Sequence, residues 1–191
     1  MSKVGFIEGK MRQVDGLWDD MRIPAQEVVT IPGPPFEPQW LQLLDDGFGS
    51  EGVYALHFDV GDQSFFNVQF PHNWKVGTDI YPHVHWTTDA SAGPGDVVWG
   101  LEFTVAPVSA SFPLTSILLT LPPGLVTGPY VHEVTGFGPP SIDGSSLGLS
   151  TMLLCRLWRD VGTYPGLIAL LEVDFHYQKD DLGSVTPFSK E

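Results

Sequence analysis

The stretch Val97-Val98-Trp99-Gly100-Leu101-Glu102-Phe103-Thr104-Val105 decides the fold class. Every second residue in it, from Val97 to Val105, is large and apolar. Successive side chains of a β-strand point to opposite faces of a sheet, so this period of two predicts a strand with one buried face. A helix would need its apolar residues three and four positions apart, and the stretch does not have that spacing.

Seven further segments show either this alternation or a short apolar run between turn signals. The chain also has 21 glycines and 17 prolines, which suits many turns and disfavours a helical bundle. About eight antiparallel strands in residues 51–191 predict an all-β domain, a jelly roll or related β-sandwich. The seven segments are 54–60, 65–70, 80–88, 114–121, 130–134, 151–159 and 167–177.

Two of these segments carry more detailed predictions. Gly61-Asp62 separates 54–60 from 65–70, so we expect these two strands to form a hairpin. In 167–177 we expect one unbroken alternation. The apolar residues Leu167, Ala169, Leu171, Val173, Phe175 and Tyr177 then share one face, and Glu172, Asp174 and His176 share the other.

Residues 1–50 differ from the rest of the chain. Residues 31–38 hold four prolines in eight positions, which excludes a helix or a central strand. We therefore expect an extended N-terminal arm close to polyproline II, with partner-binding side chains. These candidates are Trp18, Pro34, Pro35, Phe36 and Trp40. The alternative, in which the arm packs on its own domain, stays open.

The charge balance limits the partners. Nine basic residues against 23 acidic ones give a net charge of -14, so the chain repels phosphate backbones and we expect no nucleic-acid partner. The acidic surface serves solubility or docking onto a basic protein. No apolar run is long enough for a transmembrane helix, so we expect no membrane partner. The single cysteine, Cys155, lies in an apolar run and is expected to be a small buried side chain.

Residues 70–86 contain the highest density of polar side chains that could form a functional site. His83 and His85 are two apart on an expected strand, so both imidazoles project from one face and can share a divalent metal. The spacing from Gly77 to His83 and His85 resembles the first half of the cupin metal motif, with Asp89 near the motif's glutamate position. The second half of that motif is missing.

Further ligands for such a metal would come from other strands. The candidates are His57 and the polar face formed by Glu172, Asp174 and His176. In the alternative that we favour, no cofactor is bound, and His83 and His85 are hydrogen-bonded or packed at a subunit interface.

Other possible catalytic patterns are weak. Residues 144–148 match Gly-x-Ser-x-Gly, but the nucleophile elbow needs a strand before it and a helix after it. The adjacent pairs Asp19-Asp20 and Asp45-Asp46 suit turns and caps better than acid–base catalysis. We therefore expect no catalytic residues and a protein that is not an enzyme.

Several phrases together resemble a family of small tailed-phage proteins encoded among virion structural genes. They are Trp18-Asp19-Asp20, the run from Gln69 to Gly77, Tyr81-Pro82-His83-Val84-His85-Trp86, and the run from Glu172 to Gln178 with Gly183-Ser184. The resemblance implies a capsid decoration, or cement, protein on the outside of the virion. Its partners would be the major capsid protein and copies of itself in a homotrimer, assembled in the host cytoplasm. A cupin-like metal-binding protein or enzyme, or a tail or receptor-binding component, remain the alternatives.

Overall fold

A computed structural model describes residues 4–7, 10–13, 16–31, 36–89, 93–139, 141–180, 183–186 and 189. Among these residues the regular structure is nearly all β, with a single 3₁₀ turn, η1 (Ala25–Glu27). No helix in this part of the chain is long and apolar enough to cross a membrane. The strands are β1 (Val4–Ile7), β2 (Lys10–Gln13), β3 (Leu17–Pro24), β4 (Gln39–Leu44), β5 (Val53–Phe58), β6 (Gln63–Gln69), β7 (Tyr81–Thr88), β8 (Asp96–Ala106), β9 (Ser116–Leu119), β10 (Gly124–Leu125), β11 (Glu133–Gly136), β12 (Met152–Asp160) and β13 (Ile168–Lys179).

Eleven of these strands form two antiparallel sheets, which confirms the predicted β-sandwich class. The five-stranded sheet has the order β10-β8-β12-β6, with β9 also paired to β8. The six-stranded sheet has the order β11-β7-β13-β5-β4, with β3 also paired to β13. β1 and β2 pair only with each other among the described strands. All eight predicted strands are present, as β5 to β9 and β11 to β13.

The core lies between the two sheets. Phe58 of one sheet meets Trp99 of the other edge to face, with ring centroids 5.2 Å apart. Phe66 and Phe175 make the same kind of contact at 6.1 Å. Trp99 and its neighbours Val97 and Leu101 are fully buried, as the alternation in β8 predicted. Cys155 is also buried and free, and burial raises the pKa of its thiol.

The predicted hairpin between residues 54–60 and 65–70 is wrong. β5 pairs with β4 and β13, whereas β6 pairs with β12 in the opposite sheet. The connection passes through Gly61, whose φ of 93° is readily adopted only by glycine. Alternation says which side chains face the core. It does not distinguish a strand that returns in the same sheet from one that crosses to the other sheet.

β13 also breaks its predicted alternation. The pairing of β13 with β7 shifts register between Leu170 and Glu172, so Leu171 is the extra residue of a β-bulge. On the N-terminal side of the bulge, Ile168 and Leu170 face the core in place of the predicted odd-numbered residues. Beyond it, Val173 faces the core and Glu172 the outer surface, as predicted.

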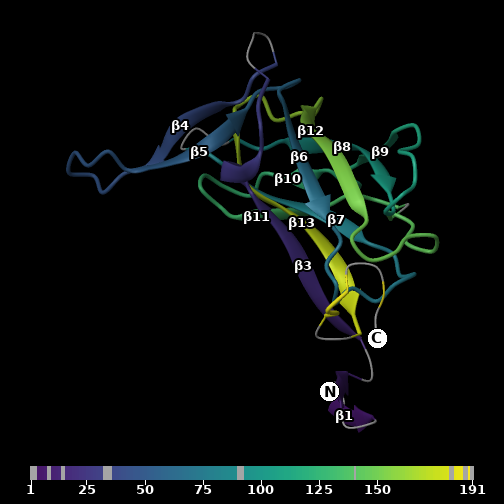
Figure 1. Cartoon of the computed structure of the whole chain (residues 1–191). Helices are drawn as coiled ribbons and strands as arrows, with labels where there is room; N and C mark the ends of the chain where they lie inside the picture. The colour runs from purple at the N-terminus through teal and green to yellow at the C-terminus, as the bar shows by residue number, and fades with distance from the viewer. Residues whose placement is uncertain are drawn as a thin grey trace.

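Two strands of the expected arm, β3 and β4, join the six-stranded sheet, as in the alternative in which the arm packs on its own domain. β3 pairs with β13 along its whole length, and Met21 and Ile23 belong to the core. β4 pairs with β5, and the two form a hairpin that projects from the body of the molecule (Figure 1). Pro34 and Pro35 lie outside the described residues, so their predicted role is still a prediction. β3 pairs with β13 beyond the three residues that pair with β5, and β4 pairs with the edge of β5 that β13 does not use.

Candidate functional site

The outer face of the six-stranded sheet collects polar side chains from β7, β13 and β3. In the antiparallel register, His83 lies opposite Asp174, and His85 lies opposite Glu172. On the other edge of β13, His176 lies opposite Asp20. Residues directly opposite each other share a face, so these side chains form one surface.

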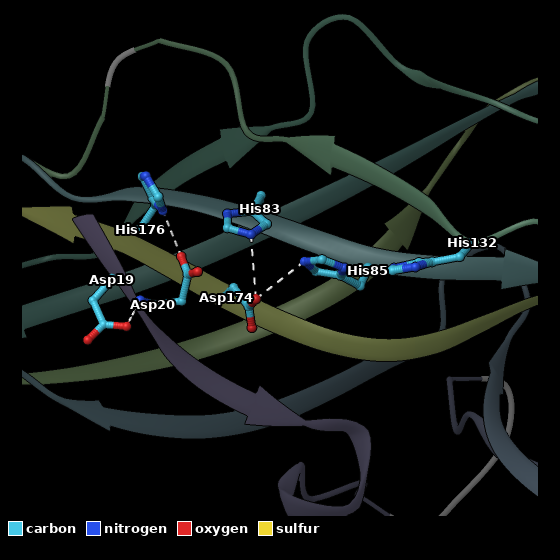
Figure 2. Close-up of polar contacts among 7 residues, drawn as sticks. All are labelled: Asp19, Asp20, His83, His85, His132, Asp174 and His176. Atoms are coloured by element: carbon cyan, nitrogen blue, oxygen red, sulfur yellow. Dashed lines mark hydrogen bonds and ion pairs between the residues drawn. The ribbon is translucent and has the colours of Figure 1, made fainter. Parts of the chain in front are cut away.

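Three of these residues form a tight cluster, the His83–His85–Asp174 triad (Figure 2). The Nε2 atom of His83 is 3.5 Å from Oδ2 of Asp174, and Nε2 of His85 is 3.3 Å from the same oxygen. The possible ligand atoms of the triad all lie within 4.8 Å of one another. The prediction that His83 and His85 share a face is confirmed, and Asp174 joins them from the neighbouring strand.

The triad is largely shielded from water. The side chain of Asp174 is 5% exposed, and those of His83 and His85 are 20% and 21% exposed. Oδ1 of Asp174 and Nε2 of His85 make no hydrogen bond with any described residue. Leaving a buried polar atom unpaired costs about 1–3 kcal/mol, so a ligand that contacts these two atoms would stabilise the fold.

Burial shifts the protonation of all three groups. It raises the pKa of Asp174 to about 7, and the nearby carboxylates of Glu172 and Asp20 add to this effect. Burial also lowers the pKa values of His83 and His85 below their ordinary range. At neutral pH both imidazoles are therefore mainly uncharged and have a nitrogen lone pair available.

Hydrogen bonds set the orientation of the two rings. Nδ1 of His85 is 2.8 Å from Nε2 of His132, which precedes β11. The ring of His83 is hydrogen-bonded to the backbone of Tyr81. If the second nitrogen of each ring donates to these partners, Nε2 is the lone-pair nitrogen facing Asp174. Sequence analysis did not identify His132 as part of this site, because β11 reaches β7 only through long-range pairing.

A second group lies beside the triad. Nδ1 of His176 is 2.8 Å from Oδ1 of Asp20, and the ring of His176 stacks on Trp18. Lys179 donates a 2.9 Å hydrogen bond to Asp19. Asp19 and Asp20 are therefore paired residues of a strand, and our assignment of them to a turn or cap is wrong.

The other predicted ligands lie elsewhere. His57 is buried beside a separate cavity of about 400 Å³, and its Nδ1 is 2.9 Å from the carbonyl oxygen of Ala55. Burial is the main cause of the raised pKa of Tyr164, and the negative charge of Asp89 raises it further. Neither His57 nor Asp89 belongs to the triad. The carboxylate of the triad is that of Asp174 on β13, and not that of Asp89 at the cupin-like position. Residues 144–148 lie in turns followed by strand β12, which is not the strand–turn–helix context of a nucleophile elbow.

No family model matches this chain, and no curated protein matches it. Among solved structures it is similar to a carbohydrate-binding module, CBM28, described as specific for non-crystalline cellulose. That similarity covers 83% of this chain and 89% of the module, with 11% sequence identity and a TM-score of 0.31.

Proposed function

We propose that this protein is a virion structural protein of a tailed phage, which docks on the major capsid protein shell and stabilises it. The resemblance of its sequence phrases to such proteins supports the proposal. Three of these phrases fall in β3, β7 and β13, where their outward side chains meet on one face. The observation that carries the proposal is the projecting β4–β5 hairpin, because a decoration protein needs an element that reaches a neighbour.

The tip of this hairpin presents an aromatic side chain. Phe48 is 95% exposed, so its whole ring is available to a partner. Its loop is held by short-range hydrogen bonds: the amide of Phe48 donates to Asp46 at 2.8 Å, and the amide of Gly47 donates to Asp45 at 2.8 Å. These bonds confirm the turn role predicted for Asp45 and Asp46, and the backbone amides lower the pKa of Asp46.

The strands behind the tip also carry exposed apolar side chains, on both faces of the hairpin. Trp40 and Leu44 of β4, with Val53 and Tyr54 of β5, are all exposed. Exposed aromatic residues of this kind are enriched at protein interfaces. Of the residues we expected to bind a partner, Trp40 therefore keeps that role in the proposal, and Phe36, which is also exposed beside Gly61, remains a candidate. The net charge of -14 favours a basic patch on the partner.

Addition of the purified protein to phage capsids that lack it tests the proposal. We expect the protein to co-sediment with the capsids and to appear as regular surface density by electron microscopy. Phe48→Ser should lower the affinity by at least about tenfold, because a buried aromatic anchor carries much of the binding energy. The matched control is Leu114→Ser, since Leu114 is as exposed as Phe48 but lies between β8 and β9, away from the hairpin.

The outcomes separate the alternatives. Binding to isolated tails in place of capsids would assign the protein to the tail, and binding to neither would overturn the proposal. Equal losses for Phe48→Ser and Leu114→Ser would remove the hairpin from the interface. The proposed homotrimer is tested by light scattering, where the mass should be three times 20.9 kDa. An unchanged mass for a His83→Ala, His85→Ala double variant would remove these histidines from the proposed subunit interface.

A further inference from the structure

We propose that His83, His85 and Asp174 bind a divalent first-row transition metal, with Zn²⁺ as the ion that fits the donor set. The ion would join β7 to β13 on the outer face of the six-stranded sheet. A fourth coordination position would remain for water or an anionic group. This proposal is independent of the virion role and stands on the geometry of the triad.

The spacing of the donor atoms supports the proposal. Ligand atoms held about 2.0–2.2 Å from one tetrahedral zinc ion lie about 3.3–3.6 Å apart. The two distances from the Asp174 carboxylate to the imidazole nitrogens are 3.5 Å and 3.3 Å. Both match an edge of such a tetrahedron.

The unpaired atoms support it independently. The buried carboxylate of Asp174 lies against two imidazole nitrogens, yet its Oδ1 and the Nε2 of His85 have no hydrogen-bond partner among the described residues. A metal ion placed between them would take up the lone pair of His85 and the charge of Asp174.

The surroundings of the triad resemble those of known metal sites in one further respect. A metal-binding histidine usually donates its other ring N–H to a fixed acceptor, which orients the ring. His85 has His132 at 2.8 Å for this purpose, and His83 has the backbone of Tyr81. Two imidazoles and one carboxylate suit zinc and its transition-metal neighbours, whereas Ca²⁺ and Mg²⁺ prefer sites made of oxygen atoms.

A shared proton is the competing account of the same geometry. In that case a proton held between Asp174 and a histidine satisfies the cluster, and no metal is needed. The two accounts differ in a measurable way, since only a metal site gives saturable binding of one ion per chain. A metal site also gives a spectroscopic signal that depends on all three residues.

The test uses the full chain after treatment with a chelator. Titration with Zn²⁺ followed by calorimetry should show one ion bound per chain, and the melting temperature should rise with the Zn²⁺ concentration. Co²⁺ should give the visible absorption of a tetrahedral site, and Mg²⁺ should give no binding. Asp174→Asn and His85→Gln should each lower the Zn²⁺ affinity by more than about tenfold, since each removes a ligand.

Two controls keep the result interpretable. His176→Gln removes a histidine of the same face that lies outside the triad, and His57→Gln removes the buried histidine of the separate cavity. Both should leave Zn²⁺ binding within about twofold of the unchanged protein. Circular dichroism of each metal-free variant checks that it is folded. The absence of stoichiometric Zn²⁺ binding would overturn the proposal, and so would a loss of binding in His176→Gln as large as that in Asp174→Asn.

Discussion

The indole ring of Trp18 lies flat on the imidazole ring of His176, with centroids 4.8 Å apart and planes inclined by 6°. Tyr81 meets the Trp18 ring edge to face, with ring centroids 5.8 Å apart. The three rings come from β3, β13 and β7, so they connect three neighbouring strands on the outer face. Trp18 was expected to bind a partner, but its main contacts in the structure are within its own sheet.

We expect Trp18→Ala to lower the free energy of unfolding by about 1–2 kcal/mol, because the variant loses a stacked pair and the apolar area that the partly exposed ring covers. Urea denaturation measures this change. Trp40→Ala is the matched control, since Trp40 is similarly exposed but has no ring partner among the described aromatic contacts. It should change the stability by less than about 0.5 kcal/mol. Equal effects would contradict the role of the stacking.

Asp174 should make stability depend on pH. Its pKa is raised to about 7 in the folded chain, so between its unfolded value and pH 7 the folded state binds more protons than the unfolded state. Its contribution therefore becomes more favourable as the pH falls from 8 to 6.5. The same contribution is lost as the pH rises through 7, where the Asp174 carboxyl group of the folded chain loses its proton. His83 and His85 act in the opposite direction below pH 6.5, because their pKa values are lowered.

Comparison with Asp174→Asn isolates the carboxyl group, because both proteins keep the two histidines. With a chelator present, the stability of the unchanged protein relative to the variant should increase by about 1 kcal/mol between pH 8 and pH 6.5. Denaturant titrations at both pH values give this difference. A constant difference across the range would show that Asp174 does not titrate there.

Arg159 should be a major contributor to stability. Its side chain is about 1% exposed, and its guanidinium donates hydrogen bonds to the carbonyl oxygens of Phe58, Gly166 and Tyr164. We expect Arg159→Ala to cost roughly 3 kcal/mol, because it leaves a cavity and three carbonyl groups without their donor.

Arg156 provides a control on the same strand. It forms a 2.7 Å ion pair with Glu102, but its side chain is over a third exposed. Arg156→Ala should therefore cost no more than about 1 kcal/mol. Thermal denaturation of both variants compares the two sites, and a larger loss for Arg156→Ala than for Arg159→Ala would contradict this assignment.

Gly100 should be intolerant of any side chain. A Cβ atom built on it would lie 2.1 Å from the indole ring of Trp158, its partner across β8 and β12. Gly100→Ala should destabilise the protein by about 1–3 kcal/mol, since Trp158 would have to move. Gly136→Ala is the control, because a Cβ atom there meets nothing within 4 Å. It should be neutral within about 0.5 kcal/mol in a melting experiment.

Most of the strands, and the side of each that faces the core, could be predicted from the sequence alone. The alternation around Trp99 and the paired positions of His83 and His85 are local properties of an extended backbone, so they could be predicted without knowing the partners of each strand. The polar face of β13, with Asp174, was predicted in the same way. The strand β3 was missed, since Asp19-Asp20 interrupts its pattern.

Which strands lie side by side could be learned from the folded structure and not from the sequence. Strand pairing depends on contacts between segments far apart in the chain, and the alternation of one strand carries no information about its neighbour. The crossing at Gly61, the bulge at Leu171 and the pairing of β3 with β13 all belong to this class. The approach of Asp174 to His83 and His85 follows from the register between β7 and β13. For this reason the sequence could propose the two histidines and four candidates for a further ligand, while the fold selected Asp174 from the four.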